Sequence, residues 1–269
     1  MRPLLRWAGS KKQLIGHLRP YWEASLAQRY VEPFAGSAAL FFDIEPKAAL
    51  LGDVNSLLVE FYTALRDTPD RIFQLTSSWA INKEKYYEIR ASLIVEKDPI
   101  LRSAMFFYLN RNCFNGIFRT NMRGEFNVPF AATKTGAMPD ISEIKQAALL
   151  LKNTKIEKKD FREILKKVKA DDFVFLDPPY AVENRRIFVQ YNAQTFGLAD
   201  LEELSDTLHC IDALGAKFVM SYAISAEALH YFDYWNVRRV TCQRNVAGFS
   251  SHRRKAVELI VSNMEKASP

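Results

Sequence analysis

The residues Asp177, Pro178, Pro179 and Tyr180 form a chemically distinctive group. They follow residues 172–176, which have the composition of a buried strand. A carboxylate, two prolines and an aromatic ring at a strand end suit one task, which is to hold a planar amino group and aim its nitrogen lone pair. Asp177 and the Pro178 carbonyl would each accept one N–H of that group. Pro179 has no N–H and stiffens the turn, and Tyr180 offers a face on which a flipped base can stack. The same residues also fit a proline-rich turn after a core strand.

The amino group of adenine is a group whose reaction would require two such acceptors. Its nitrogen is a poor nucleophile because the lone pair is delocalised into the ring. Two acceptors outside the ring plane favour the pyramidal nitrogen that attack requires, so they stabilise the transition state over the ground state. The residues from Asp177 to Tyr180 therefore favour chemistry at an exocyclic amino group.

A loop of small residues forms a second candidate site. Residues 33–38 join an expected strand at 29–31 to a helix that begins near residue 39, so backbone could approach a ligand at the start of the helix. Phe34 and Gly36 lie in this loop, which is not a GxGxxG sequence. Asp53 ends the next expected strand, where an acid can take two ribose hydroxyls. The alternatives are a purely structural loop and a helix-capping role for Asp53.

Composition narrows the class of protein. The 269 residues are 48% apolar and 25% charged, which is typical of a soluble globular protein with one large domain or two small ones. We expect no membrane segment and no signal peptide, because the chain lacks a run of 18 apolar residues and its start lacks an apolar stretch. A net charge of +6 suits a nucleic-acid partner.

The cysteines and histidines indicate where the protein works and argue against a metal site. Three widely spaced cysteines fit a reducing, cytoplasmic compartment better than a disulfide framework. The four histidines are scattered, and neither Cys-x-x-Cys nor His-x-x-x-His occurs, so we expect no metal.

The expected elements give an α/β fold, a doubly wound, Rossmann-like sheet with a helical and hairpin insertion after its second strand. Apolar residues recur at helical spacing through much of residues 59–146, and the stretch between 112 and 129 is rich in Gly and Asn. A helix is expected at 199–213. Strands are expected at 29–31, 48–51, 172–176, 216–221, 236–241 and 256–262.

In order along nearly the whole chain, these motifs resemble those of the Dam-type DNA adenine-N6 methyltransferases. Residues 5–14 resemble the family's N-terminal Trp-Ala/Thr-Gly-Gly-Lys motif, and residues 32–41 resemble its cofactor loop. Residues 110–130 are similar to its DNA-reading hairpin, and residues 177–180 match its Asp-Pro-Pro-Tyr. Residues 250–263 are similar to its closing hairpin. The resemblance implies a methyltransferase sheet, with residues 1–58 and 147–269 as the catalytic, cofactor-binding domain and 59–146 as the target-recognition domain.

The resemblance also implies a reaction. It is the direct transfer of a methyl group from S-adenosyl-L-methionine to N6 of a flipped-out adenine in a short sequence of double-stranded DNA, with GATC favoured. The implied catalytic residues are Asp177, Pro178 and Tyr180. The implied cofactor-binding residues are Trp7, Lys11, Phe34, Gly36, Asp53, Asp160, Phe161 and Asp177. Lys11 is expected at the cofactor carboxylate, and Asp160 and Phe161 at its adenine.

The DNA-binding residues come from the same resemblance. Arg119 would read guanine through O6 and N7, and Ile117 and Pro129 would give apolar contacts. Asn121 and Asn127 would contact phosphate. The full expected set is Arg6, Ile117, Arg119, Asn121, Asn127, Pro129 and Tyr191. A monomer is expected in solution, with a cognate restriction nuclease as a further partner.

Some residues depart from the family pattern. The first departure below is mild, and the others bear on the recognition sequence rather than on catalysis. Ser10 replaces a glycine, Arg6 replaces the usual lysine, residues 131–135 lack the usual Gly-Arg-Tyr, and Ser221-Tyr222 stands where Ser-Asn is usual. Alternative functions are an RNA or protein amino-group methyltransferase of the same fold and an inactive DNA-binding relative. A nucleotide-dependent oxidoreductase is a further alternative, which the absence of GxGxxG opposes.

Overall fold

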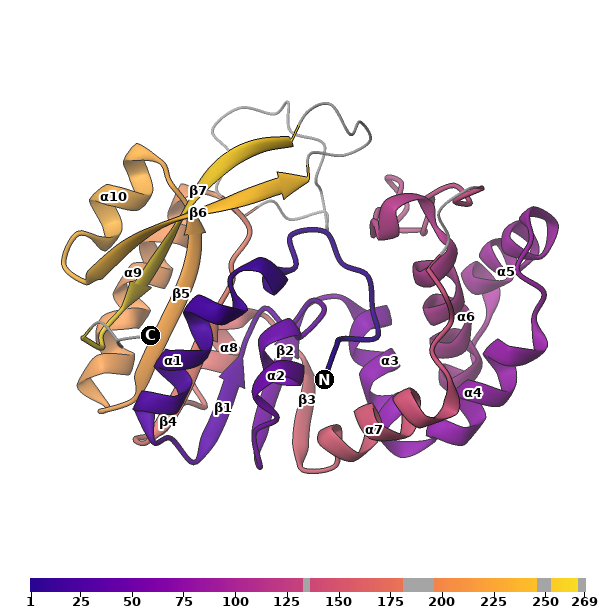
Figure 1. Ribbon diagram of the computed structural model, residues 1–269, viewed down its shortest axis with the longest axis horizontal. Helices are drawn as coiled ribbons and strands as arrows, with labels where there is room; N and C mark the ends of the chain where they lie inside the picture. Colours follow the sequence, from indigo (N-terminus) through magenta and orange to yellow (C-terminus); the bar gives the residue numbers. More distant parts are fainter. Residues whose placement is uncertain (133–135, 181–195, 246–252, 266–269) are drawn as a thin grey trace.

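A seven-stranded, mostly parallel sheet forms the centre of the computed structural model, which describes residues 1–132, 136–180, 196–245 and 253–265 (Figure 1). Only β7 runs against its neighbours in this sheet. In spatial order the strands are β3 (Thr154–Lys158), β2 (Ala49–Asp53), β1 (Arg29–Glu32), β4 (Asp172–Leu176), β5 (Lys217–Ala223), β7 (Arg253–Ser262) and β6 (Asn236–Asn245).

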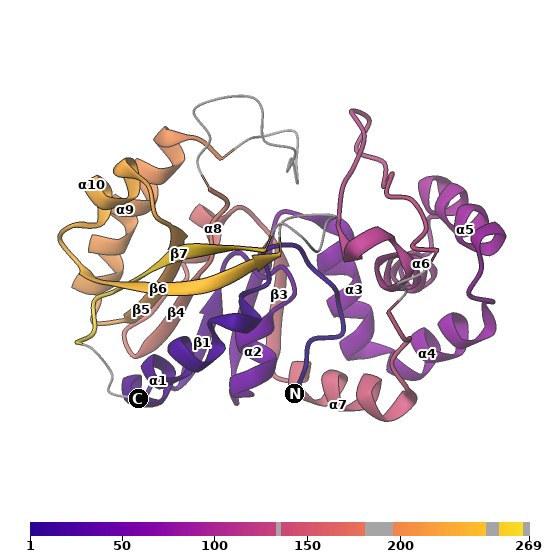
Figure 2. The ribbon, with the colours of Figure 1, turned by 45° about the horizontal axis from the view of Figure 1, so that its top comes forward.

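Helices cover both faces of the sheet, as expected for a doubly wound fold (Figure 2). Alternate residues of the central strands point to opposite faces. Phe173 and Phe175 pack with the helices α1 (Ile15–Ser25) and α2 (Ala39–Ile44). Val174 and Leu176 pack on the other face with the helices α8 (Phe161–Leu165), α9 (Leu198–Ala213) and α10 (Ala226–Phe232). The whole of β4 is buried, which is why its sequence is a continuous run of mostly apolar residues.

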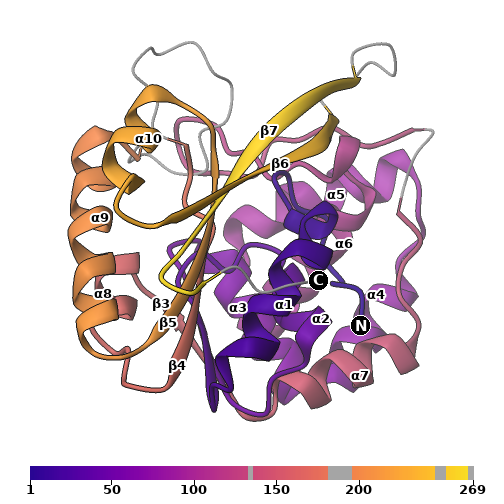
Figure 3. The same cartoon turned by 60° about the vertical axis from the view of Figure 1, so that its left-hand side comes forward.

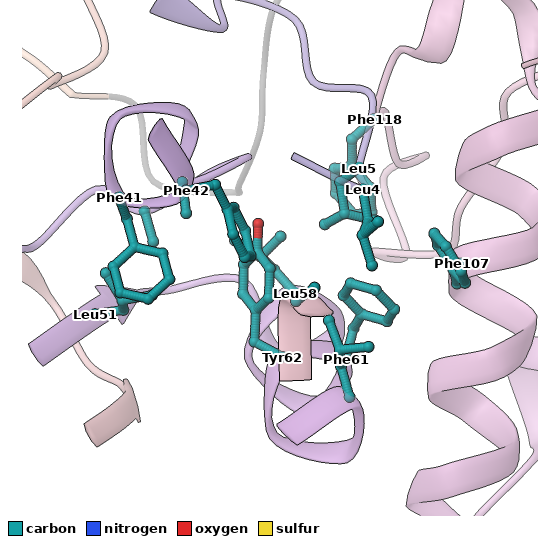
Figure 4. Packing of buried hydrophobic residues seen from close by; sticks show 14 of the residues in the cluster. Leu4, Leu5, Phe41, Phe42, Leu51, Leu58, Phe61, Tyr62, Phe107 and Phe118 are labelled. Atoms are coloured by element: carbon teal, nitrogen blue, oxygen red, sulfur yellow. The ribbon is translucent and has the colours of Figure 1, made fainter. Parts of the chain in front are cut away.

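The expected insertion after the second strand is helical and lies beyond the β3 edge of the sheet (Figure 1). It shares one core with the sheet, because Phe61 and Phe107 belong to the same buried cluster as Phe41 and Leu51 (Figure 4). The expected limits at 58 and 147 fall inside its first and last α-helices. Its elements are α3 (Ser56–Asp67), α4 (Pro69–Ser78), α5 (Lys83–Val95), α6 (Pro99–Asn112), the 3₁₀ turn η2 (Phe114–Gly116) and α7 (Ile141–Leu151).

All six expected strands are present, and β3 is an addition. Its sequence carries charged residues on both sides of Ile156, which an edge strand tolerates, and only Thr154 of its five residues is fully buried. The last two strands are longer than expected. Only residues 258–262 of β7 pair with β5, whereas 253–262 pair with β6, so the two strands continue together past the sheet (Figure 3).

The chain changes direction across the sheet between β1 and β4. Strands β2 and β3 follow on one side of β1, and β5 follows on the other side of β4. In open parallel sheets, ligands bind outside the carboxyl ends of the strands at such a point. Residues 33–38 follow β1 and residues 177–180 follow β4, so the topology brings the two candidate sites together.

Among the described helices, none is long and apolar enough to cross a membrane.

Candidate active site

The carboxylate of Asp177 lies just beyond the end of β4 and receives two donors on the same oxygen. The Lys11 ammonium is 2.8 Å from Oδ1, and the Ser221 hydroxyl donates to Oδ1 over 3.0 Å. Among the described residues, donors to this carboxylate reach Oδ1 alone. Ser221 belongs to the neighbouring strand β5 and is fully buried. Oδ2 is therefore the oxygen with capacity for a further donor.

Lys11 is held between acidic and hydroxyl oxygens. Its ammonium donates to the Tyr180 hydroxyl over 3.4 Å and to the Gly9 carbonyl over 3.2 Å, in addition to Asp177. Burial lowers the pKa of Lys11, but the charges of Asp177, Tyr180 and Glu258 outweigh it and raise that pKa above the ordinary value. Lys11 is therefore a fixed positive charge at neutral pH, and in this structure it neutralises Asp177.

Tyr180 is fixed at both ends of its side chain. Its hydroxyl lies 3.1 Å from each carboxylate oxygen of Glu258, a buried residue of β7. Its ring meets the Tyr222 ring edge-on, with centroids 5.4 Å apart. Both residues of the Ser221-Tyr222 departure thus contact the Asp-Pro-Pro-Tyr group directly.

The loop after β1 is tied to the end of β2. The Gly36 N–H donates to Asp53 Oδ2 over 3.0 Å, and the Asn55 N–H donates to Asp53 Oδ1 over 2.9 Å. Burial raises the pKa of Asp53, and these backbone donors partly offset the rise. Gly36 has φ +46°, and a Cβ there would lie 3.0 Å from the Trp7 ring. The loop thus requires glycine at this position for conformation and for space.

An aromatic cluster includes Phe34 of the loop after β1. The rings of Phe34 and Phe161 are stacked with centroids 5.3 Å apart, and Phe196 contacts both rings. Asp160 caps α8 by accepting the Arg162 N–H over 3.0 Å. The Arg162 guanidinium pairs with Asp160 and, on α9, with Asp200 and Glu203. Phe196 was not among the residues expected from sequence, because its partners are distant in the chain.

The segment after α6 folds into the expected hairpin. Asn127 N donates to the Arg119 carbonyl over 3.1 Å, and Asn121 N donates to the Glu125 carbonyl over 2.9 Å. The Tyr86 hydroxyl of α5 donates to the Val128 carbonyl over 2.9 Å, which anchors the hairpin base to the helices. Trp7 stacks on the hairpin residue Phe118 with centroids 5.3 Å apart. Since Trp7 also contacts Gly36, one ring joins the loop after β1 to the hairpin.

The expected DNA-reading residues occupy different environments. Arg119 is exposed, and its Nε donates to Asn127 Oδ1 over 2.8 Å. The Asn121 side chain holds the tip, since its Oδ1 accepts from the Arg123 and Glu125 N–H groups. Ile117 is partly buried, and Pro129 is exposed.

Another member of the expected set, Arg6, lies away from the exposed part of the hairpin. The Arg6 guanidinium donates to the Arg111 carbonyl over 3.1 Å, below the hairpin. A Cβ at Gly116 would clash with the Arg6 side chain, so the hairpin base packs directly on it. Tyr191 lies outside the described residues.

Two polar site residues were absent from the sequence-based expectation. Glu258 reaches the site because β7 pairs with β5, and Ser221 reaches it because β5 pairs with β4. The Ser10 departure is accommodated, since the Ser37 hydroxyl donates to its Oγ over 3.0 Å. Within the described ranges, no cluster of three or more potential metal ligands occurs.

The chain resembles known proteins over nearly its whole length. A family model described as "D12 class N6 adenine-specific DNA methyltransferase" matches residues 7–257. The chain is 31% identical to the type II methyltransferase M1.LlaDCHI of Lactococcus lactis subsp. cremoris, covering 98% of this chain and 95% of that protein. It is 30% identical to the type II methyltransferase M.MjaIII of Methanocaldococcus jannaschii, covering 98% and 99%. It is 32% identical to the DNA adenine methylase of Serratia marcescens, covering 77% and 78%.

Proposed function

Because the chain belongs to the D12 class of N6 adenine-specific DNA methyltransferases, we propose that Asp177, Pro178 and Tyr180 form its catalytic centre. We also propose that S-adenosyl-L-methionine is its methyl donor. The observation that carries the proposal is the Asp177 carboxylate, whose Oδ1 is engaged by Lys11 and Ser221. Oδ2 and the neighbouring Pro178 carbonyl would then accept the two N–H bonds of a target amino group.

The proposed role of these acceptors is electrostatic. As the adenine nitrogen becomes pyramidal, its N–H groups gain positive character, and a fixed carboxylate oxygen stabilises that change without reorganising. Lys11 and Ser221 hold the carboxylate in place, so little orientation has to be gained during the reaction. The Tyr180 ring, fixed by Tyr222 and Glu258, offers the flat surface for the flipped base.

The residues around Gly36 fit the methyl donor. When bound, S-adenosyl-L-methionine supplies a methyl group on an already activated sulfonium. Asp53 would hold ribose hydroxyls, since each of its oxygens accepts one backbone bond and a carboxylate can accept about four in all. The stacked rings of Phe34 and Phe161, with Asp160 beside them, would hold the adenine. Trp7 and Gly36 would border the amino-acid end of the donor.

We propose a second role for Lys11, beside the expected one at the cofactor. It was expected to meet the cofactor carboxylate, whereas its ammonium lies on Asp177 in this structure. We assign it to the catalytic side of the centre, where it orients Asp177. Lys11 also donates to the Gly9 carbonyl, so it would remain close to the proposed donor site.

We further propose that residues 59–146 carry target recognition and that the hairpin at 112–130 enters the major groove. Arg119 is exposed and its guanidinium is held along the hairpin by Asn127, so a planar fork is presented that matches guanine O6 and N7. Ile117 and Pro129 would add apolar contacts, and Asn121 and Asn127 would contact phosphate while shaping the hairpin. GATC is the first sequence to test. Since every group named comes from one chain, a monomer on double-stranded DNA suffices.

Sequencing of methylated adenines in DNA from cells that express the chain tests the proposal. We expect N6-methyladenine in a single short sequence, and no such signal from cells that express Asp177→Ala at the same level. Methylation of cytosine, or equal adenine methylation in the Asp177→Ala cells, would contradict the assignment of the centre.

A further inference from the structure

Glu258 is a buried acid on β7, and the next three residues of the strand, Leu259 to Val261, are buried and apolar. It lies on β7 opposite Ala223 of β5 and Val240 of β6, between strands that pair on both sides. The residue is only 3% exposed, and the next residue, Leu259, is fully buried. A carboxylate in such a place is costly unless it is hydrogen-bonded. The buried Glu258 carboxylate therefore needs hydrogen-bond partners that offset the cost of its burial.

The Tyr180 hydroxyl is one such partner. It lies 3.1 Å from Oε1 and 3.1 Å from Oε2 of Glu258, so the carboxylate receives it symmetrically. The Lys11 ammonium lies 3.4 Å from the same hydroxyl and 2.8 Å from Asp177. Glu258 thus ends a continuous line of polar contacts that passes through Tyr180 and Lys11 to the carboxylate at the reacting centre.

The geometry of the Tyr180 ring depends on this contact. Tyr222 touches the ring edge-on, with an interplanar angle of 81°, and so supports the ring from one side. An edge-on contact still lets a ring tilt about its Cβ. A second fixed point at the hydroxyl, the far end of the side chain, prevents that tilt. With both supports, the plane of Tyr180 is set before any base arrives.

We propose that Glu258 is a positioning residue for methyl transfer, which holds the Tyr180 ring in the plane on which the target adenine stacks. The inference rests on the proposed function of Tyr180 as the stacking surface. Glu258 acts through the Tyr180 hydroxyl and touches neither base nor donor. A loss of the tether leaves the adenine bound but misaligned, so it lowers kcat and leaves the KM for the methyl donor nearly unchanged.

Four variants test this inference: Glu258→Ala, Glu258→Gln, Tyr180→Phe and the double variant Tyr180→Phe with Glu258→Ala. The amide of Gln still accepts from a hydroxyl, whereas Ala cannot. We expect Glu258→Ala to lower kcat about 10- to 100-fold and Glu258→Gln to remain within about fivefold of wild type. Tyr180→Phe keeps the ring and removes only the hydroxyl, so it should lower kcat to a similar extent as Glu258→Ala. The double variant should be no slower than Tyr180→Phe alone, because the two residues act as one unit.

A second readout does not depend on turnover. A duplex with 2-aminopurine in place of the target adenine reports stacking of the flipped base, because an aromatic ring quenches its fluorescence. A looser Tyr180 ring should lengthen the fluorescence lifetime in Glu258→Ala and leave it unchanged in Glu258→Gln. Ser262→Ala is the matched control, since it removes another buried polar side chain from β7, one that bonds to Phe218. It should alter neither kcat nor the lifetime.

The inference is overturned if Tyr180→Phe keeps wild-type kcat, or if Glu258→Ala slows the Tyr180→Phe enzyme as much as it slows the wild type. The first result would show that the hydroxyl tether is irrelevant, and it requires no change at Glu258 that could disturb folding. The wild-type rate in the same assay reports on the proposed function, whereas the ratios among variants report on Glu258, so the two can fail separately.

Discussion

The ammonium of Lys11 lies 2.8 Å from Oδ1 of Asp177, and this ion pair joins the beginning of the chain to the strand end where chemistry is proposed. The two side chains are 11% and 21% exposed, so water screens the pair only in part. The pairing supports the proposed role of Lys11 beside Asp177, which the sequence alone did not indicate.

Removal of the Lys11 charge should shift the pH dependence of methyl transfer. Burial raises the pKa of Asp177, and the Lys11 ammonium pulls it down again. In Lys11→Met the pull is lost, so the pKa of Asp177 rises further and the carboxylate stays protonated to higher pH. Since the ionised form is the acceptor, the acid limb of kcat should move to higher pH, and the rate should fall most at low pH.

The measurement is kcat from about pH 5.5 to pH 9 at saturating donor and DNA. Lys12→Met is the matched control, because Lys12 is the adjacent lysine and its charged neighbours are the cations Arg111, Arg2 and Arg6. Its profile should keep the wild-type shape. Parallel profiles for wild type and Lys11→Met would show that Lys11 does not tune Asp177.

Substitution of Asp177 should separate charge from hydrogen-bond acceptance. Asp177→Ala removes both acceptor oxygens and should lower turnover by about 100-fold or more. Asp177→Asn keeps an amide oxygen and should be less severe. Circular dichroism and DNA affinity should change little in both, because Asp177 lies beyond the end of β4 and outside the apolar core. An alanine variant that retains more than roughly a hundredth of the wild-type rate would remove Asp177 from the centre.

Asp53 should govern affinity for the methyl donor. Asp53→Ala removes the proposed ribose contact and also frees the Gly36 N–H, which the carboxylate now holds. We expect a weaker donor affinity by isothermal titration, of about tenfold or more for the loss of charge-assisted hydrogen bonds, with the KM for DNA nearly unchanged. Asp67→Ala removes an acid that is paired with Arg66 at the end of α3 and serves as the control. Equal donor affinity in Asp53→Ala and wild type would return Asp53 to a loop-holding role.

Sequence reasoning performed best where function and fold share one local pattern. The apolar run before Asp177 fixed both a strand and the place where it ends, and β4 has the expected bounds. The pairing of Lys11 with Asp177 could not be read in this way, because it depends on where the first residues cross the carboxyl end of β4. Glu258 was missed for a similar reason. An acid in an edge hairpin looks like a solvent-facing charge until the pairing of β7 with β5 buries it.

The edge strand β3 was not predicted because strands were recognised by their runs of apolar residues. β3 has a charged residue on either side of Ile156, so it lacks the apolar run that made the other strands recognisable. Arg6 illustrates a different limit. Its residue type suits DNA contact, but its place below the hairpin depends on Gly116 and on carbonyls that only the folded chain brings to it.

We expect Arg119 to contribute to sequence specificity and Arg123 to contribute only to DNA affinity. Arg119 is presented from the hairpin arm with its Nε held by Asn127, so its planar fork can meet one guanine. Arg119→Ala should cost about 1–3 kcal/mol on the preferred site and relax discrimination at a single base pair. Arg123, exposed at the tip beside Gly124, is the matched control, and Arg123→Ala should weaken all duplexes alike. The measurement is kcat/KM on a set of duplexes, each with one base pair of the preferred site replaced. If Arg119→Ala loses activity equally on every duplex and keeps the wild-type order of preference, Arg119 contacts phosphate or supports the hairpin, and another residue reads the target.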